Sequence, residues 1–216
     1  MIAGRRYRAV TIHAMNDDQV NPLREMLARF VSASAVASAD ARRHAENVLK
    51  FIASETRPWS RATLAGHLTA SAWVLDRAQT YAVLIHHRKL NRWLQPGGHV
   101  DDTDTSWRAA AQREVTEETG LRTFVAPLDA DGLFDVDVHP IPAREDEPAH
   151  FHYDLRFLFV ADVDAALEGQ LQLNTDEAHA GRWFRLIDLA NDPALEPSLL
   201  RMIELSIRRL GNNSVI

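Results

Sequence analysis

The stretch GGHVDDTDTSWRAAAQREVTEETGL, residues 97–121, decides which fold this chain adopts. It opens with a glycine pair, Gly97 and Gly98, directly after Pro96. Glycine adopts strained backbone conformations at little steric cost, so the pair predicts a tight turn with exposed carbonyl groups. The remainder of the stretch has the pattern of a helix.

The predicted helix has a signal at each end. Asp104 and Thr105 are residue types that favour a helix N-cap, and Gly120 suits the left-handed position that ends a helix. We therefore expect a helix from about Asp104 to Thr119. The glycine turn would lead directly into it.

Three carboxylates share one face of this predicted helix, because their spacing is i, i+3, i+4. They are Glu114, Glu117 and Glu118. Like charges this close repel each other, and a hard divalent cation with oxygen ligands, Mg²⁺ or Mn²⁺, would relieve the repulsion. The plainer alternative is a solvated helix face on which Arg113 pairs with Glu117.

The same stretch resembles the signature of the Nudix hydrolases. That signature reads glycine, five residues, an acid, seven residues, then Arg-Glu-apolar-x-Glu-Glu-x-Gly-apolar. The half from Arg113 to Leu121 matches at every defined position. In the other half, Asp104 stands in place of a glutamate, and eight residues rather than seven separate it from Arg113.

The resemblance implies a fold, an activity and a metal site. The fold would be an α/β/α sandwich with a mixed sheet, and the activity Mg²⁺-dependent hydrolysis of a diphosphate bond in a nucleoside diphosphate linked to another group. Glu114, Glu118 and Glu117 would bind the metal, and the Gly97 carbonyl would complete its ligands. A catalytically silent Nudix-fold module that senses a nucleotide is the alternative function.

The resemblance also implies a carboxylate base. Glu117 is one candidate, and Glu177, in a loop before Trp183, is the other, with Asp176 as its fallback. Arg113 is expected to contribute to catalysis by fixing the conformation of a glutamate.

Substrate contacts are expected on a polar strand face. The predicted strand over residues 149–163 alternates polar and apolar side chains, which predicts one apolar face and one polar face. The polar face carries His150, His152, Asp154 and Arg156. We expect it to line a cleft; an ordinary wet sheet face and a second metal site built from the histidines and Asp154 are the alternatives. Three polar residues before the glycine pair are further candidates for contact with phosphate or base: Arg88, Lys89 and Gln95.

Two parts of the chain are expected. Residues 1–60 read as a helical N-terminal extension, with amphipathic helices over 17–34 and 39–54, and residues 61–212 as the catalytic domain. The domain begins with a predicted β-hairpin over 66–89. The extension would carry either substrate specificity or a homodimer interface.

The amino-acid composition excludes several kinds of functional site. The 216-residue chain has no cysteine, so disulfides, thiolate zinc sites and a cysteine nucleophile are excluded. Its net charge of −6 argues against broad nucleic-acid binding, which needs a basic surface. With no apolar run of about 18 residues and no signal peptide pattern, we expect a cytoplasmic protein. The resemblance implies that its substrate is a small nucleotide-like diphosphate.

Overall fold

The strand β1, Gly66–Leu75, is the centre of the sheet and is buried along its whole length. It runs parallel to β7, His150–Ala161, with Gly66 opposite Phe151 and Leu75 opposite Val160. On its other side it pairs antiparallel with β4, Gly97–His99. The glycine pair is therefore held against the middle of the most buried strand.

The computed structural model describes residues 17–33, 38–125, 132–144, 147–165, 171–176 and 178–213. The other strands complete a mixed sheet, in which β2 follows β1 in a hairpin. They are β2 Tyr81–His87, β3 Arg92–Leu94, β5 Phe124–Val125, β6 Asp135–Ile141 and β8 Ala178–Arg185. The helices are a 3₁₀ turn Asp17–Gln19, α1 Val20–Ser32, α2 Ala39–Ser54, α3 Trp107–Thr119, α5 Leu186–Leu189 and α6 Pro197–Asn213.

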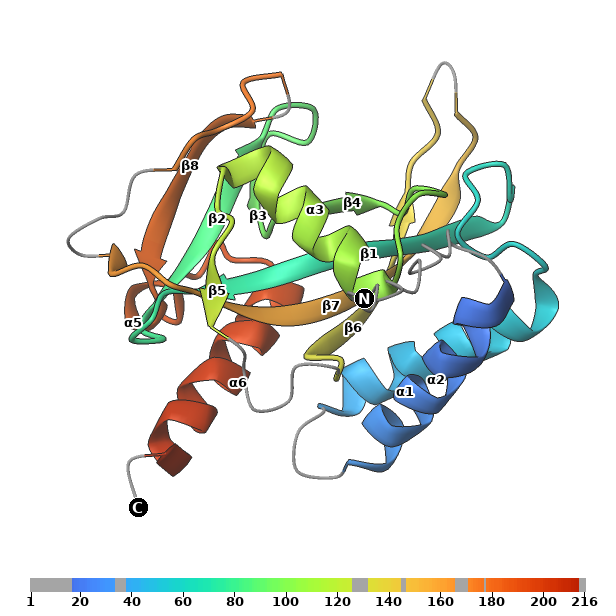
Figure 1. Ribbon diagram of the computed structural model, residues 1–216, viewed down its shortest axis with the longest axis horizontal. Helices are drawn as coiled ribbons and strands as arrows, with labels where there is room; N and C mark the ends of the chain where they lie inside the picture. The colour runs from blue at the N-terminus through green and yellow to red at the C-terminus, as the bar shows by residue number, and fades with distance from the viewer. Residues whose placement is uncertain are drawn as a thin grey trace, which may run out of the picture.

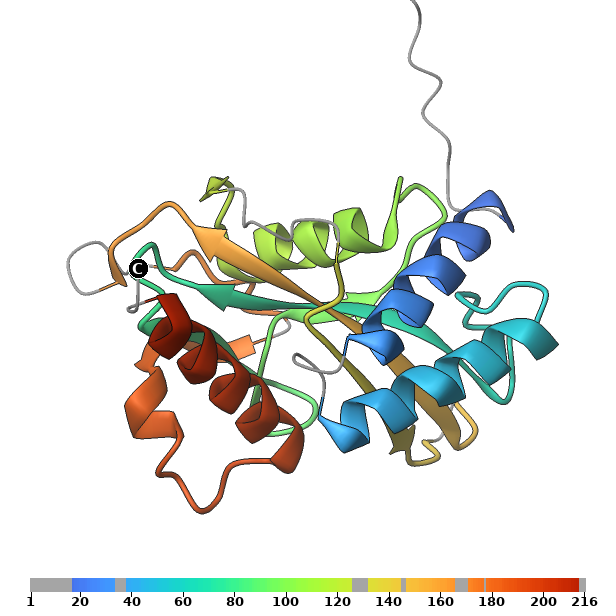
Figure 2. The ribbon, with the colours of Figure 1, turned by 90° about the horizontal axis from the view of Figure 1, so that it is seen from below.

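Helices cover both faces of the sheet (Figures 1 and 2). One apolar core joins alternate β1 residues such as Ala70 and Val74 to α3, and a second core joins Trp73 and Leu75 to α6. Because β1 alternates between two covered faces, both sets of its side chains are buried. The predicted α/β/α sandwich with a mixed sheet and a preceding helical region is confirmed.

The helices α1 and α2 extend the α3-side core of their own chain. Leu23 and Leu27 of α1 and Val48 of α2 are fully buried there. The Phe51 ring stacks on Tyr153 of β7 at a centroid distance of 4.0 Å. The N-terminal helices thus pack on the sheet itself, while the boundary near residue 60 stays a prediction. None of the helices within the described residues is long and apolar enough to cross a membrane.

Candidate active site at the glutamate helix

The helix α3 begins later than its sequence predicts. Its N-cap is Ser106, whose Oγ accepts a hydrogen bond of 3.1 Å from the backbone N–H of Ala109. The prediction that Asp104 and Thr105 cap the helix is therefore wrong. The extra residue before Arg113 is absorbed in the loop, so the spacing within the helix is unchanged.

Asp104 instead binds Arg113. The Asp104 carboxylate is 6% exposed and accepts hydrogen bonds from Nε and Nη2 of Arg113, both at 3.1 Å. It also accepts a 2.8 Å hydrogen bond from the backbone N–H of Asp101. Two parallel bonds between a guanidinium and a carboxylate form a strong, directional pair, which closes the loop onto the helix.

Arg113 also holds two glutamates. Its Nη1 donates to Glu114 Oε1 and to Glu117 Oε2, each at 3.0 Å, and its Nη2 donates to the backbone carbonyl of His99 at 2.9 Å. Burial alone would lower the pKa of Arg113, but its bonds to Asp104 and the surrounding carboxylates raise that pKa above its ordinary value. Arg113 is thus a permanent cation that orients its neighbours.

The glycine pair lies against the other side of the glutamates. The backbone N–H of Gly97 donates a 2.9 Å hydrogen bond to Glu118 Oε2. A Cβ on Gly97 would come within 2.2 Å of the Ser71 Cβ, and one on Gly98 within 2.7 Å of Glu114 Oε1. Glycine is required at position 97 because β1 approaches its backbone so closely, whereas a side chain at position 98 would displace the Glu114 carboxylate.

These contacts bring together five of the predicted site residues: Gly97, Arg113, Glu114, Glu117 and Glu118. The residues Glu114 and Glu118 are 9% and 3% exposed, whereas Glu117 is exposed at the rim. Buried carboxylates are costly unless they are paired or bind a metal. The cluster offers oxygen donors, which fits a hard cation such as Mg²⁺.

The segment 171–176 lies beside the C-terminal end of α3. The backbone N–H of Gln172 donates to the Thr119 carbonyl at 2.9 Å, and Arg88 Nη2 donates to the Thr175 carbonyl at 2.6 Å. Asp176, the fallback base, is exposed, whereas Glu177 lies outside the described residues. Lys89 is exposed in the turn between β2 and β3.

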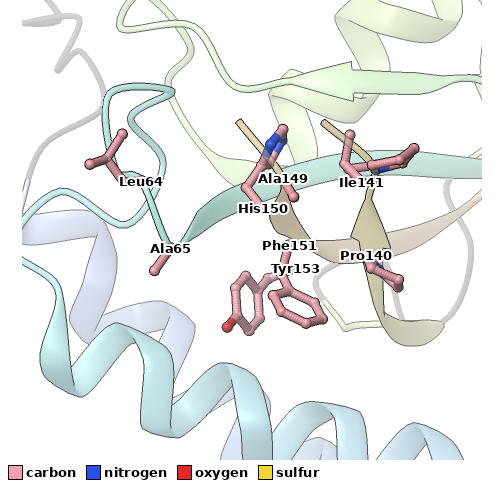
Figure 3. A pocket seen from close by; sticks show the side chains of 9 residues that line it. Leu64, Ala65, Pro140, Ile141, Ala149, His150, Phe151 and Tyr153 are labelled. Atoms are coloured by element: carbon pink, nitrogen blue, oxygen red, sulfur yellow. The ribbon is translucent and has the colours of Figure 1, made fainter. Parts of the chain in front are cut away.

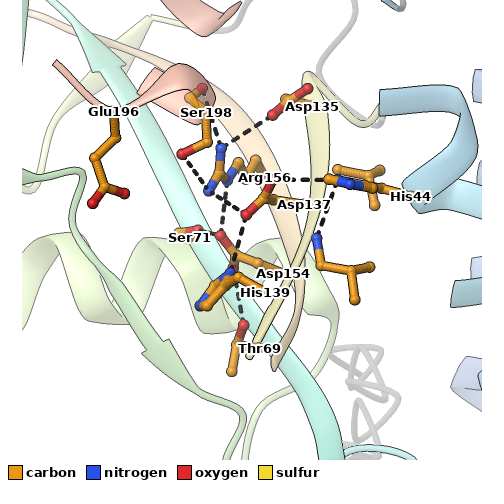
Figure 4. Close-up of polar contacts among 12 residues, drawn as sticks. His44, Thr69, Ser71, Asp135, Asp137, His139, Asp154, Arg156, Glu196 and Ser198 are labelled. Atoms are coloured by element: carbon orange, nitrogen blue, oxygen red, sulfur yellow. Dashed lines mark hydrogen bonds and ion pairs between the residues drawn. The ribbon is translucent and has the colours of Figure 1, made fainter. Parts of the chain in front are cut away.

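The polar face of β7 contains a buried ion network (Figure 4). Arg156 is 2% exposed, and its guanidinium bonds Asp154 Oδ2 at 2.9 Å and Asp135 Oδ2 at 3.1 Å. Arg201 of α6 bonds Asp135 and Asp137, which links the last helix to the sheet. Asp154 and Arg156 are thus engaged with protein partners, and their contact with substrate stays a prediction.

Asp137 is stabilised in its charged form by this network. Burial alone would raise the pKa of its carboxyl group. The hydrogen bond with His139 and the cations Arg156 and Arg201 outweigh burial and hold the pKa well below its ordinary value.

Gln95 connects the network to the glycine turn. Its Nε2 donates to Ser71 Oγ at 3.3 Å and to Asp154 Oδ2 at 3.4 Å. Its Oε1 is buried and has no hydrogen-bond partner in the described parts of the chain. A buried acceptor without a partner needs a donor, and a ligand hydroxyl or N–H group that entered the site would supply one.

Histidines gather at the far end of the same face. The ring of His67 lies 4.9 Å from His99, 5.0 Å from His150 and 4.8 Å from His152. Burial, the neighbouring imidazoles and the Arg61 cation lower the pKa of His67 and of His99 to about 4, and burial and the imidazoles lower that of His152 to about 2. These three rings are therefore neutral at pH 7.

A largely apolar hollow of about 670 Å³ opens next to this end of the sheet (Figure 3). The residues that line it are Leu64, Ala65, Pro140, Ile141, Pro142, Ala149, His150, Phe151 and Tyr153. The glutamates of α3 are not among them. Ala70, the partner of Gly98, is four residue steps from Gly66 along β1, which is roughly 13 Å along an extended strand. We therefore assign the chemistry to the carboxylates and not to the hollow.

Two features of the structure were not predicted from the sequence. They are the ion pair between Asp104 and Arg113 and the presence of His67 and His99 in the histidine cluster. The acid at position 104 was recognisable, but a helix cap was the wrong role for it. The two histidines stand on separate strands, and single-strand alternation does not show which residues of another strand lie beside them.

The chain matches one family model over more than half of its length. The model of a family described as the NUDIX domain matches residues 66–205. A NUDIX family hydrolase from Clostridium perfringens is 22% identical, with a TM-score of 0.48 over 67% of this chain and 97% of its own. The Ap4A hydrolase of C. elegans in a binary complex is 18% identical, with a TM-score of 0.45 over 67% and 98%.

A third solved structure is the NUDIX domain of Shewanella oneidensis NrtR complexed with ADP ribose. It is 19% identical, with a TM-score of 0.46 over 74% of this chain and 97% of its own. The comparison with curated proteins gives no match. At these identities and TM-scores the likenesses say nothing about substrate.

Proposed function

Because this chain belongs to the NUDIX domain family, a family of pyrophosphohydrolases, we propose that it hydrolyses the diphosphate bond of a nucleoside diphosphate linked to another group, with Mg²⁺ as cofactor. One observation carries the proposal. The buried carboxylates of Glu114 and Glu118 lie against the glycine turn, and Arg113 holds the cluster in place.

The chemistry of a diphosphate explains why such a cluster is needed. Its phosphoryl oxygens are negatively charged and repel an attacking water, so hydrolysis requires charge neutralisation and an oriented nucleophile. Mg²⁺ bound by Glu114, Glu118, Glu117 and the Gly97 carbonyl would supply positive charge and raise the acidity of water. Mn²⁺ has similar ligand preferences and is an alternative cofactor.

The residues of the chain have separate tasks in this proposal. Arg113 holds Glu114 and the Gly97 N–H holds Glu118, so both carboxylates are already oriented and would hold the metal. Among the described residues Glu117 accepts one hydrogen bond, from Arg113, and 51% of its side chain is exposed, so it is either the third metal ligand or the base. Glu177 is the second candidate base.

Substrate contact is proposed for Gln95 and Lys89. Gln95 presents a buried free acceptor beside the glycine turn, and Lys89 is an exposed cation on the turn after β2. The polar residues of β7 are less suited, because Asp154 and Arg156 are engaged in ion pairs. These assignments extend the predictions made from the sequence.

The experiment is a substrate panel with product identification. The purified protein is incubated with nucleoside triphosphates, ADP-ribose, NADH and dinucleoside polyphosphates, each with Mg²⁺, with Mn²⁺ and with EDTA. The proposal expects metal-dependent cleavage at the diphosphate of at least one class. Ligand binding that raises the melting temperature while every compound stays intact would favour the silent sensor instead.

A further inference from the structure

Four neighbouring strands place histidines on one face of the sheet. His67 of β1 lies directly opposite His152 of β7, and His152 lies opposite His139 of β6. His150 precedes His152 by two residues, so both side chains point the same way. His99 of β4 is next to β1 on the other side, and its ring is 5.3 Å from that of His152.

Several buried ring nitrogens of this group lack a hydrogen-bond partner in the described parts of the chain. His67 is 1% exposed, and neither of its ring nitrogens has a hydrogen-bond partner among the described residues. Within the same part of the chain, the buried Nε2 atoms of His99 and His150 also lack a hydrogen-bond partner. An unsatisfied buried polar group costs about 1–3 kcal/mol, so several in one place require an explanation such as an unseen ion.

The orientation of His150 is that of a metal ligand. Its Nδ1 lies 2.9 Å from the Pro148 carbonyl oxygen. A carbonyl only accepts, so Nδ1 carries the proton and the lone pair of the neutral ring is on Nε2. A hydrogen bond from one ring nitrogen to a backbone carbonyl fixes the tautomer in histidines that bind metals through the other.

From this geometry we propose that His67, His150 and His152 bind a transition-metal dication, Zn²⁺, at a site separate from the glutamates. One nitrogen from each ring lies within 4.8 Å of the corresponding nitrogens of the other two. Three such atoms surround a point about 2–3 Å away, and small rotations bring them to the Zn–N distance of about 2.0–2.1 Å. Imidazole suits Zn²⁺, whereas Mg²⁺ prefers oxygen.

The surroundings complete this site. His152 is only half-buried, which leaves a path for the ion. Glu147 Oε1 lies 3.8 Å from His150 Nε2 and is a carboxylate within reach of a fourth position. Asp154, which the sequence pairs with these histidines, is not among the residues whose ligand atoms converge, and its carboxylate is instead bonded to Thr69, Ser71 and Arg156.

The test is zinc binding to the metal-stripped full-length protein in excess Mg²⁺, so that the glutamates are already occupied. Equilibrium dialysis with elemental analysis should give one Zn²⁺ per chain, and Zn²⁺ should raise the melting temperature by about 5 °C or more at saturation. His150→Gln and His152→Gln should each lose this zinc. His179→Gln, at an exposed histidine outside the cluster, should retain it, and so should Glu118→Gln.

Two results would overturn the proposal. One is full zinc stoichiometry in both cluster variants, and the other is loss of zinc in Glu118→Gln alone. X-ray absorption on the wild-type protein with Zn²⁺ covers the case in which a cluster variant does not fold. A shell of at least three nitrogen ligands with imidazole scattering supports the site, and an oxygen shell contradicts it.

Discussion

Replacing Arg113 by alanine is the most informative perturbation of the site. The guanidinium makes five hydrogen bonds: two to Asp104 and one each to Glu114, Glu117 and the His99 carbonyl. Alanine keeps the helix propensity but removes every one of them. The variant therefore leaves the carboxylates in place without their common cation.

The expected loss of stability in Arg113→Ala follows from how deeply the charged groups are buried. Removing one partner of a buried charge pair costs about 3–5 kcal/mol, because the other charge stays buried and unpaired. Asp104 and Glu114 are 6% and 9% exposed, but 24% of the Arg113 side chain reaches water, which lessens the loss. We expect a destabilisation of about 3 kcal/mol, or a melting temperature about 6–12 °C lower for a chain of this length.

The assay is thermal and urea unfolding in EDTA, so that no metal compensates for the missing cation. Arg43→Ala is the matched control: Arg43 pairs with Asp40 at 2.9 Å, but both side chains are more than half exposed. Its loss should cost less than about 0.5 kcal/mol. In a double-mutant cycle, Arg113→Ala and Asp104→Asn should couple by at least about 1 kcal/mol. Equal effects of Arg113→Ala and Arg43→Ala, or additive effects in the cycle, would refute the reasoning.

Three further predictions concern the neighbouring groups. Gly98→Ala puts a methyl group 2.7 Å from Glu114 Oε1, so the carboxylate must move, and Mg²⁺ affinity measured by titration calorimetry should fall about 10-fold or more; unchanged affinity contradicts this. Arg156→Met removes the cation that pairs with buried Asp154, while Asp135 and Asp137 keep Arg201, and it should cost about 3–5 kcal/mol in urea unfolding, whereas a cost below about 1 kcal/mol would mean that the network is solvated. The lowered pKa of Asp137 contributes stability above pH about 4 that is lost as the pH falls further, so the difference in melting temperature between wild type and Asp137→Asn should shrink between pH 6 and pH 3; a constant difference contradicts the lowered pKa.

The glutamate face could be predicted because its geometry is local. Residues i, i+3 and i+4 share a helix face in any protein, so Glu114, Glu117 and Glu118 needed no knowledge of the rest of the chain. The turn at the glycine pair could be predicted for the same reason, since conformational freedom is a property of glycine itself. The α/β/α layers could be predicted from the order of the helical and strand patterns along the chain, because the folded protein keeps those helices and strands.

The residues that these side chains contact were harder to predict from the sequence. A carboxylate before a helix has two common roles, cap or ion pair, and Asp104 takes the second because Ser106 already supplies the cap. The histidine cluster depends on parallel pairing that sets His67 beside His152 across a long stretch of intervening chain. Alternation within one strand identifies a face, but it does not identify the neighbouring strand or what covers that face.

Turnover by Glu118→Gln tests the central claim most directly. The reference enzymes are the wild type and Glu204→Gln, which makes the same change at an exposed position on α6. On the best substrate of the panel at saturating Mg²⁺, we predict that Glu118→Gln loses turnover by a factor of about 100 or more while its melting temperature stays within a few degrees of wild type. Glu204→Gln should match the wild type. Near wild-type turnover by Glu118→Gln would contradict the assignment of the chemistry to the glutamate face.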